Sequence, residues 1–392
     1  MKQWPDSPSV RRRILCVIRW PVGGIRTYLR YVYPVLERAG YNFTFVGPND
    51  ETFERFRNEW YTDGEAEFIP AIMRRGRCHL WSVVRSELRS GRYSLIHSQG
   101  VVATCESVLA NVWTRVPHLM TSHDVFRSTH SQTWLSSLKI RCVAEILRRT
   151  DAIVAVSHDV ACNHLETLTN LRRGPTQVVT ICNGIPVNMF QPTRDATVCD
   201  LRHRYSLSPD TRIIGFLGRF MPQKGIDILL QAVVRIREMA SVVPFRIIVI
   251  ASDDCEVRYR RQAHELGLTK EVIFHPFEPD PRAVMRSLDL LVIPSLWEAC
   301  PILPMEALVM GIPIVGTDCI GLREVLAGTP AVSVLTGDPV SLANGLLQAI
   351  ANPKYDDARA YAPHAALRFD VRNSANSLLR LCDSVIQRRS DM

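Results

Sequence analysis

The chain alternates short apolar runs with amphipathic stretches, and this alternation constrains the fold more than any other feature. In the first half, six apolar runs are predicted to be strands: 12–20, 41–47, 93–98, 117–123, 151–157 and 176–184. Most are continuous apolar runs that end in a polar or glycine-rich turn, as in a parallel sheet covered on both faces. Stretches with helical periodicity lie between them, for example 25–38, 101–114 and 134–149. This order of strand and helix predicts a doubly wound α/β domain.

After a polar, irregular segment near 186–208, the same alternation restarts. The strands predicted in the second half are 212–218, 245–251, 271–276, 289–294 and 312–317. The predicted helices are 225–239, 256–266, 281–287, 302–310 and 339–351, with a final amphipathic helix at 371–388. A chain of 392 residues is also too long for one ordinary core. We therefore predict two Rossmann-like, doubly wound domains that face a central ligand cleft.

The predicted domain limits follow from this restart. The N-terminal domain spans 1–190 and the C-terminal domain spans 191–370. Residues 371–392 form a C-terminal helix that is a candidate to pack back on the N-terminal domain.

The net charge of +8 lies in the first half of the chain. Residues 1–190 carry 24 Lys and Arg against 16 Asp and Glu, whereas the remainder carries 23 of each. This asymmetry indicates an acidic partner, and charge alone leaves open nucleic acid, anionic lipid or a phosphorylated substrate. Because no RRM, helix-turn-helix or zinc-finger pattern accompanies the arginines, we expect no nucleic-acid partner.

Two basic amphipathic stretches lie in this half. One spans 71–95 and the other spans 134–149. The arginines of the first are Arg74, Arg75, Arg77, Arg85, Arg89 and Arg92. A basic face beside an aromatic and aliphatic face can lie on an anionic membrane surface. An ordinary surface helix, packed by its apolar side, is an equal alternative.

The expected location is cytoplasmic, with peripheral contact at the inner face of the membrane as a hypothesis. No apolar run approaches the roughly 18 residues of a spanning helix. The apolar run after Arg13, "ILCVI", is too short for a signal-peptide core. The eleven cysteines form no C-x-x-C pair, and free thiols in a reducing compartment are the expected state.

Two segments of the second half carry candidate chemistry. In "GFLGRFMPQKGIDILLQAV" (215–233), a strand is followed by the turn at Gly218, then by Arg219 and Lys224, and then by a helix. Two cations at the carboxyl end of a strand suit a diphosphate. Two solvated surface charges are the alternative.

The second segment is "PSLWEACPILPMEALVMGIPIVGTD" (294–318), in which Glu298 and Glu306 are eight positions apart in an apolar stretch. Pro301 and Pro304 suit the start of a helix, and Gly311 suits its end. A carboxylate beside the backbone N–H groups of such a helix start could hold a sugar hydroxyl and a phosphate together. Two helix-capping carboxylates are the alternative reading of this pair.

In combination these segments resemble the retaining nucleotide-sugar glycosyltransferases of family four, also called glycosyl transferases group 1. The resemblance includes the E-x7-E signature, Glu298 to Glu306. In the first half, "PVGGIRTYL" is similar to the family's diglycine loop at Gly23 and Gly24, and "TSHD" to its cleft histidine, His123. "VSHDV" and "NGIPVNMF" are similar to its domain-connecting motif. The resemblance covers nearly the whole chain and implies the GT-B fold, with an acceptor-side N-terminal domain and a C-terminal domain that binds the nucleotide sugar.

The resemblance also implies roles for individual residues. Arg219 and Lys224, beside Gly218, would bind the donor diphosphate and stabilise the leaving group. Glu298 would contact the hydroxyls of the donor sugar, and Glu306 those of the ribose. Further predicted donor contacts come from Gly23, Gly24, His123 and the amides around Ile302 and Leu303. Glu298, His123, Arg219 and Lys224 are the predicted catalytic residues.

The resemblance further implies transfer with retention of the anomeric configuration, by front-face attack and without a covalent intermediate. A UDP- or GDP-sugar is the expected donor, and a glycan or lipid-linked acceptor, as in polysaccharide biosynthesis, is the expected partner. No D-x-D motif occurs, so neither a cofactor nor a metal ion is expected. Two other functions stay open: a GT-B nucleotide-sugar epimerase or hydrolase, and a non-catalytic sugar-nucleotide-binding scaffold.

Overall fold

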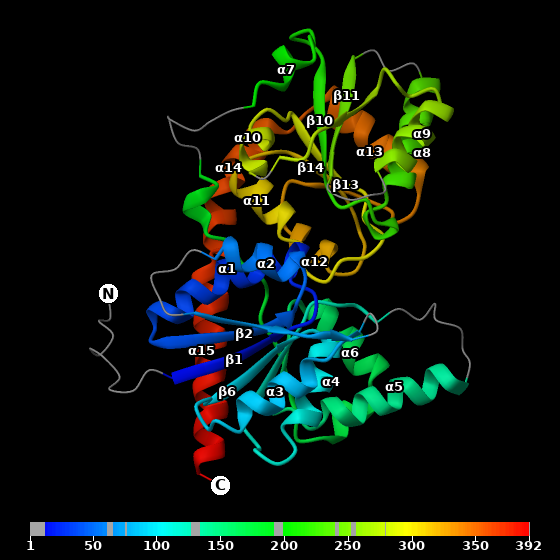
Figure 1. The fold of residues 1–392 in the computed structure, drawn as a ribbon. Helices are drawn as coiled ribbons and strands as arrows, with labels where there is room; N and C mark the ends of the chain where they lie inside the picture. The colour runs from blue at the N-terminus through cyan, green and yellow to red at the C-terminus, as the bar shows by residue number, and fades with distance from the viewer. Residues whose placement is uncertain are drawn as a thin grey trace. The chain divides into compact units, whose positions relative to one another are not determined.

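The chain divides into two structural units. The computed structural model describes residues 12–60, 66–74, 77–126, 134–191, 199–239, 243–251, 256–278 and 280–391. Unit 1 comprises the chain through Gly184 together with the C-terminal segment from Val371, and unit 2 comprises Ile185–Asp370 (Figure 1). The final helix of the chain therefore belongs to the same unit as the first strands.

Unit 1 is built on a seven-stranded sheet with the order β3-β2-β1-β6-β7-β8-β9. All neighbours in it run parallel. The strands are β1 (Arg12–Ile18), β2 (Tyr41–Pro48), β3 (Glu67–Ala71), β6 (Leu95–Gln99), β7 (His118–Ser122), β8 (Ala152–Ala155) and β9 (Gln177–Thr180). The short strands β4 (Met73–Arg74) and β5 (Arg77–Cys78) form a separate antiparallel pair.

Helices cover both faces of this sheet, as the continuous apolar strands require. In β1, Ile14, Cys16 and Ile18 belong to one core cluster, whereas Leu15 and Val17 belong to another. The helices are α1 (Gly23–Arg38), α2 (Glu51–Asn58), α3 (Leu80–Leu88), α4 (Val101–Ala110), α5 (Trp134–Leu147), α6 (His158–Thr167) and α15 (Val371–Ser390). The last of these packs beside α1, and its Leu378 and Cys382 are fully buried in the same cluster as Ile14 (Figure 1).

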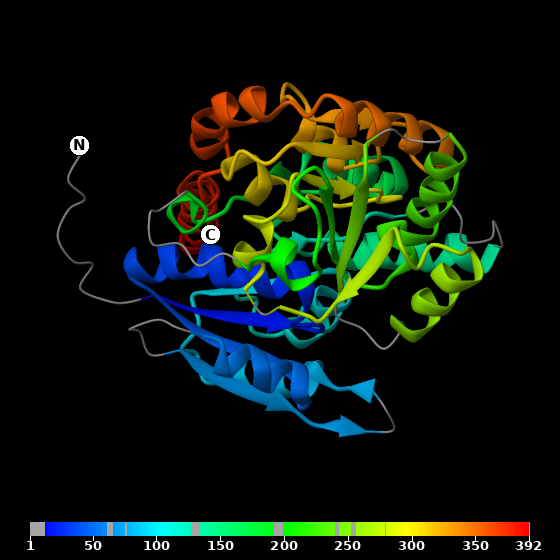
Figure 2. The ribbon, with the colours of Figure 1, turned by 90° about the horizontal axis from the view of Figure 1, so that it is seen from above.

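Unit 2 is built on a six-stranded parallel sheet with the order β12-β11-β10-β13-β14-β15. The strands are β10 (Arg212–Gly218), β11 (Phe245–Ala251), β12 (Val272–His275), β13 (Leu290–Ile293), β14 (Ile314–Thr317) and β15 (Val332–Val334). The helices are α7 (Leu201–Arg204), α8 (Ile226–Glu238), α9 (Glu256–Glu265), α10 (Pro281–Met285), α11 (Leu303–Val309), α12 (Leu322–Leu326), α13 (Pro339–Ala351) and α14 (Tyr355–Arg368). Helices α8 and α13 lie side by side, and their buried residues share one core with the strands (Figures 1 and 2).

The prediction of two Rossmann-like α/β domains is confirmed by these two sheets. The bounds of β10, β11 and α13 match the predicted ones, and most other predicted elements are shorter than predicted by a few residues. Some of the elements that were not predicted have weak signals. The edge strands β3 and β15 are short and partly exposed, and α14 contains Pro363, which interrupts a helical pattern.

Candidate functional site

The loop after β10 and the loop after β13 are in direct contact, and a glycine makes this possible. Gly225 has a left-handed backbone (φ +69°) between the short 3-10 helix Pro222–Lys224 and α8. A Cβ at this position would lie 1.9 Å from the carbonyl oxygen of Pro294, just after β13. Only glycine fits both the backbone conformation and this approach.

Two hydrogen bonds hold the same loops together. The backbone N–H of Leu296 donates to the carbonyl of Gln223 (2.8 Å), and the Gln223 side chain donates to the carbonyl of Trp297 (2.8 Å). Residues 223 and 224 are therefore fixed beside residues 296–298, although more than seventy positions separate them in the chain.

This arrangement places Lys224 against Glu298. The Lys224 Nζ donates to Oε1 of Glu298 at 2.7 Å, and the hydroxyl of Ser295 donates to the same oxygen at 2.7 Å. The Glu298 side chain is 8% exposed and that of Lys224 is 27% exposed. A buried carboxylate needs such partners, because desolvation of an unpaired charge is costly. Both contacts are on Oε1, so the carboxylate keeps acceptor capacity on its other oxygen.

The backbone around Glu298 is also closely held. Its N–H donates to the carbonyl of Ile320 (3.0 Å). Gly321 has a φ of +77°, and a Cβ there would lie 2.2 Å from the carbonyl oxygen of Glu298. Glu298 is thus a rigidly placed carboxylate with a cation beside it.

The other predicted donor-side residues of unit 2 lie before Lys224 or after Glu298 in the sequence. Glu306 is only 6% exposed and lies in the first turn of α11, where a negative charge is favourable. Ile302 is the N-cap of α11, and Leu303 is its first residue. Gly218 ends β10, and the half-buried Arg219 follows it.

The predicted residues of unit 1 are Gly23, Gly24 and His123. Gly23 begins α1 with a φ of +54°, which suits glycine. A Cβ on Gly24 would meet no protein atom within 4 Å, so packing within the chain does not require glycine there. His123 directly follows β7 and is half-buried, with its ring edge-on to that of Tyr28 at 4.9 Å.

His123 is tied to a chain of buried hydrogen bonds that its sequence context does not indicate. Its Nε2 lies 2.9 Å from Oε1 of Gln99, the last residue of β6. Because the Gln99 amide nitrogen donates to the hydroxyl of Tyr33 (3.0 Å), its oxygen is the acceptor for an N–H on His123. The Tyr33 hydroxyl contacts Nδ1 of His97 (2.8 Å), and Nε2 of His97 contacts the hydroxyl of Thr121 (2.7 Å).

The side chains of this hydrogen-bond network are uncharged near neutral pH. Burial lowers the pKa of His97 and of His123 to about 3. Burial also raises the pKa of Tyr33 well above its ordinary range. His123 therefore presents a neutral imidazole whose Nε2–H is engaged and whose Nδ1 is an acceptor. This arrangement suits contact with a sugar hydroxyl and disfavours a role as a general acid.

Three positioning residues were not predicted from the sequence. Gln99 contacts His123, and Ser295 contacts Glu298. Gln223 holds the loop that carries Lys224. Gln99 ends β6, next to β7, and a polar residue at the carboxyl end of a parallel strand was an available signal. No comparable signal marks Ser295 or Gln223, because their contacts depend on how the two loops of unit 2 approach each other.

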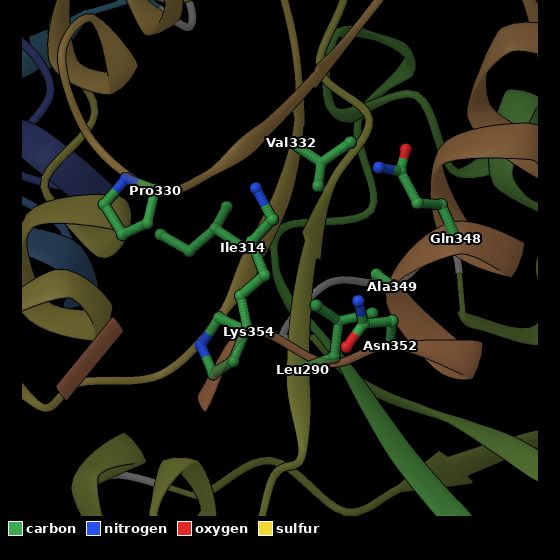
Figure 3. Close-up of a pocket in the computed structure, with 9 residues that line it drawn as sticks. Leu290, Ile314, Pro330, Val332, Gln348, Ala349, Asn352 and Lys354 are labelled. Atoms are coloured by element: carbon green, nitrogen blue, oxygen red, sulfur yellow. The ribbon is translucent and has the colours of Figure 1, made fainter. Parts of the chain in front are cut away.

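A pocket of unit 2 lies away from these residues. It is lined by the first residues of three strands, Leu290, Ile314 and Val332, with Gln348 and Lys354 among the others (Figure 3). Its volume is about 30 Å³. It lies at the amino ends of these parallel strands, whereas Lys224 and Glu298 follow the carboxyl ends. Its size suits one or two water molecules and not a nucleotide sugar.

Two Rossmann-like units, each built on a parallel sheet, form the GT-B fold, and similar solved structures share it. The model of Glycosyltransferase Family 4 matches residues 22–188, and the model of Glycosyl transferases group 1 matches residues 211–352. The chain belongs to glycosyltransferase family 4.

Known proteins with similar sequences are glycosyltransferases too. The chain is 27% identical over 308 residues to a D-inositol 3-phosphate glycosyltransferase of Corynebacterium urealyticum, which covers 75% of this chain and 72% of the relative. It is 26% identical over 334 residues to the lipopolysaccharide core biosynthesis mannosyltransferase LpsB of Rhizobium meliloti, covering 82% of this chain and 79% of the relative.

The fold is also that of solved structures. HepE of Anabaena, crystallised with UDP-glucose, has a TM-score of 0.79 to this chain at 20% identity, covering 95% of this chain and 99% of HepE. At this level of identity the match establishes the fold and not the substrate.

Proposed function

We propose that this glycosyltransferase uses a nucleotide-sugar donor and transfers the sugar with retention of the anomeric configuration. The observation that carries the proposal is the contact of Lys224 with Glu298 at 2.7 Å, in a family member whose sequence also has Arg219 and Glu306. A cation for the diphosphate and a carboxylate for the sugar are thereby adjacent in one rigid pair of loops.

The proposed roles combine this contact with the roles that the family resemblance implies. The Lys224 ammonium has three N–H donors and uses one on Glu298, so it can also donate to phosphate oxygens. With Arg219 it would stabilise the negative charge that develops on the leaving diphosphate. Glu298 would accept from sugar hydroxyls through its second oxygen, and Glu306 from the ribose. Gly218 and the amides of Ile302 and Leu303 would flank the phosphates.

In unit 1 the proposal uses Gly24, for the donor phosphates or the acceptor, and His123, for the donor sugar. Gly24 leaves open space where a Cβ would stand, so a ligand can approach the backbone at the start of α1. His123, held by Gln99, would contact the sugar near the reacting carbon as a neutral group. We propose front-face attack in which the departing phosphate accepts the proton of the acceptor hydroxyl, with no covalent intermediate on Glu298.

Several properties of relatives inform the choice of substrates. HepE was crystallised with UDP-glucose, so a UDP-sugar is a natural first donor to test, with a GDP-sugar beside it. A relative named for D-inositol 3-phosphate and another named for the lipopolysaccharide core favour a phosphorylated or lipid-linked glycan acceptor. The proposal needs no metal ion, because Arg219 and Lys224 supply the positive charge at the diphosphate. Rates without added Mg²⁺ or Mn²⁺ should equal those with either ion.

The test is a transfer assay on the purified chain. Nucleotide release from UDP-glucose, UDP-galactose and GDP-mannose is measured with and without inositol phosphate or a lipid-linked acceptor, and NMR gives the product's anomeric configuration. Lys224→Ala and Glu298→Ala should each lower acceptor-dependent turnover by about 10²–10³-fold. The exposed Lys270→Ala serves as the matched control and should leave it unchanged.

The outcomes separate the competing functions. Donor conversion that needs no acceptor would indicate an epimerase or hydrolase. Donor binding without turnover under all conditions would indicate a scaffold. Full turnover in both Lys224→Ala and Glu298→Ala would refute the assigned site.

We also propose peripheral contact with an anionic membrane through part of unit 1. Within its described residues, no helix is long and apolar enough to cross a membrane. The turn after α4 exposes 69% of Trp113, and α3 exposes 39% of Trp81. The guanidinium of Arg85 lies 4.1 Å from the ring centroid of Trp113 and 5.4 Å from that of Trp81. A cation between two exposed indoles suits a lipid headgroup region.

The basic stretch 71–95 supports this contact only in part. Arg92 pairs with Glu67 and Glu87, so its charge is largely compensated. Arg75 and the side chains of Arg74 and Arg77 lie outside the described residues. In the second stretch, Arg148 pairs with Glu145.

Sedimentation with vesicles tests the membrane proposal. Wild type should bind vesicles that contain an anionic lipid more than neutral ones, and the double variant Trp81→Ser/Trp113→Ser should bind less. Leu367→Ser, which changes an apolar residue of unit 2 that is 76% exposed, is the control. Equal sedimentation of wild type and the double variant would contradict the proposal.

A further inference from the structure

Three side chains of unit 2 gather in a cluster that the proposed transfer reaction does not use. The thiol of Cys199, the imidazole of His275 and the carboxylate of Glu278 each offer one atom, and these atoms all lie within 4.8 Å of one another. Cys199 precedes α7, His275 is the last residue of β12, and Glu278 lies in the loop that follows. The chain therefore brings residues 76 to 79 positions apart to one point.

We propose that Cys199, His275 and Glu278 bind a divalent transition metal ion of the zinc class. Thiolate, imidazole and carboxylate are the three side chains that zinc takes, and three protein ligands leave a fourth position for water or a small ligand. The distance from Nε2 of His275 to Oε1 of Glu278 is 3.3 Å. Two ligands about 2.0–2.1 Å from one tetrahedral ion lie about 3.3 Å apart, so this pair has the required separation.

The histidine is oriented for the ion by a second group. The hydroxyl of Tyr205 lies 2.6 Å from Nδ1 of His275. Metal-binding histidines use their other ring nitrogen in this way, which fixes the ring and its tautomer. With Nδ1 engaged by Tyr205, Nε2 is the nitrogen that is hydrogen-bonded to Glu278, and a bound ion would replace the proton between them. The side chain of His275 is fully buried, which protects such a bond from solvent.

The position of the thiol is set by contacts that do not involve the ion. The backbone N–H of Cys199 donates to the carbonyl of Ala283 in α10 (3.0 Å), and the hydroxyl of Ser287 donates to the Cys199 carbonyl. These bonds anchor the segment before α7 to the helix that follows Glu278. In the ion-bound state the thiolate and the carboxylate would together carry two negative charges, which would offset the neighbouring Arg204.

A second cysteine–histidine contact in the chain provides a matched comparison. Sγ of Cys162 lies 3.6 Å from Nδ1 of His158, one turn away on α6. Cys162 is exposed, and among the described residues no third ligand-type group joins this pair. The proposal therefore predicts metal binding by the cluster in unit 2 and not by the pair in unit 1.

The ion would connect the start of unit 2 to the edge strand of its sheet. An ion that binds the folded unit and not the unfolded chain raises its stability by mass action. This role is structural, so failure of the proposed transfer reaction would not contradict the metal site, and failure of the metal site would not contradict the transfer reaction.

Cobalt provides the direct test, because a cobalt–thiolate bond absorbs in the near ultraviolet. The full chain, freed of metal by a chelator and kept reduced, is titrated with Co²⁺ and then with Zn²⁺. Wild type should take up one ion per chain with a thiolate band that Zn²⁺ abolishes, and its melting temperature should rise with Zn²⁺. Cys199→Ser and His275→Ala should lose the band, whereas Cys162→Ser should keep it.

One further variant and one control measurement make the result decisive. Tyr205→Phe, which removes only the orienting hydroxyl, should weaken Zn²⁺ binding by about tenfold and leave the band in place. Circular dichroism and the melting temperature in metal-free buffer show whether Cys199→Ser is folded. A wild-type chain with no thiolate band overturns the proposal. So does a band that survives in folded Cys199→Ser or disappears in Cys162→Ser.

Discussion

The candidate sites of the two units differ in how they satisfy buried polar groups. In unit 1, His123 ends a chain of neutral hydrogen bonds through Gln99, Tyr33 and His97. In unit 2, Lys224 and Glu298 form a charged pair in two glycine-dependent loops. Under the proposed function, the neutral hydrogen-bond network of unit 1 would orient a ligand without attracting charge. The charged pair of unit 2 would supply a cation for a diphosphate and a carboxylate for a sugar. The comparison therefore predicts that only unit 2 stabilises charge in the reaction.

The largest expected effect on stability comes from breaking the charged pair. Lys224→Met removes the cation and leaves the Glu298 carboxylate, 8% exposed, with the Ser295 hydroxyl as its remaining partner. We expect the free energy of unfolding to fall by about 3 kcal/mol. Urea denaturation measures this change.

A double variant sharpens the same comparison. In Lys224→Met/Glu298→Leu no charge is left buried, so much of the lost stability should return. If the double variant is as unstable as the sum of the two single variants, the pair is not coupled and the electrostatic interpretation of unit 2 is wrong.

As pH falls, unit 1 should lose folding stability at a higher pH than unit 2. The pKa values of His97, His118 and His123 are lowered by burial to about 3, below the ordinary value of 6.5. Between these values the unfolded chain binds more protons than the folded one, so stability is lost as pH falls below about 6.5. Each such histidine costs about 2 kcal/mol at pH 5.

Hydrogen exchange at several pH values can localise this loss. Peptides from β6 and β7 should lose protection between pH 6.5 and 4.5, whereas peptides from β10 and β13 should retain theirs. His97→Gln should make the loss in β6 smaller. An equal loss of protection in both units would show that the histidines of unit 1 do not dominate acid unfolding.

Replacing Gln99, which orients His123, should have a smaller effect, and we expect it in the transfer rate. Gln99→Leu removes the acceptor for Nε2–H and the donor to Tyr33, and Gln99 is 2% exposed. We expect transfer to fall by about tenfold, chiefly in kcat, because the imidazole can then rotate. Gln99→Glu keeps the acceptor for Nε2–H and should recover part of the rate. A change confined to stability, with kcat unaltered, would make Gln99 a structural residue only.

The smallest effect on folding is expected at the diglycine loop. Gly24→Ala places a methyl group where no protein atom lies within 4 Å, so the melting temperature should stay within about one degree of wild type. If a ligand approaches this backbone, KM for donor or acceptor should rise. Gly225→Ala is the contrasting variant, because its Cβ would collide with the Pro294 carbonyl and should lower the melting temperature strongly. Identical kinetics of wild type and Gly24→Ala would remove this loop from the site.

The sequence determined the two sheets and most of the residues that the site proposal uses. Continuous apolar runs such as 212–218 and 245–251 have one favourable solution, a parallel strand buried on both faces, so local pattern and fold agree. The spacing of Glu298 and Glu306, with prolines at the helix start, likewise placed both carboxylates around α11.

Only the tertiary structure decided which side chains meet. Lys224 and Glu298 are 74 positions apart, and their contact depends on a loop approach that Gly225 permits. The pairing of Gln99 with His123 requires β6 and β7 to be neighbours, and the cluster of Cys199, His275 and Glu278 requires α7 to lie near the end of β12. A hydrophobic pattern reports which residues are buried, because burial is a property of each position. Hydrogen bonds and ion pairs are directional and short, so the geometry of distant segments decides which partners they join.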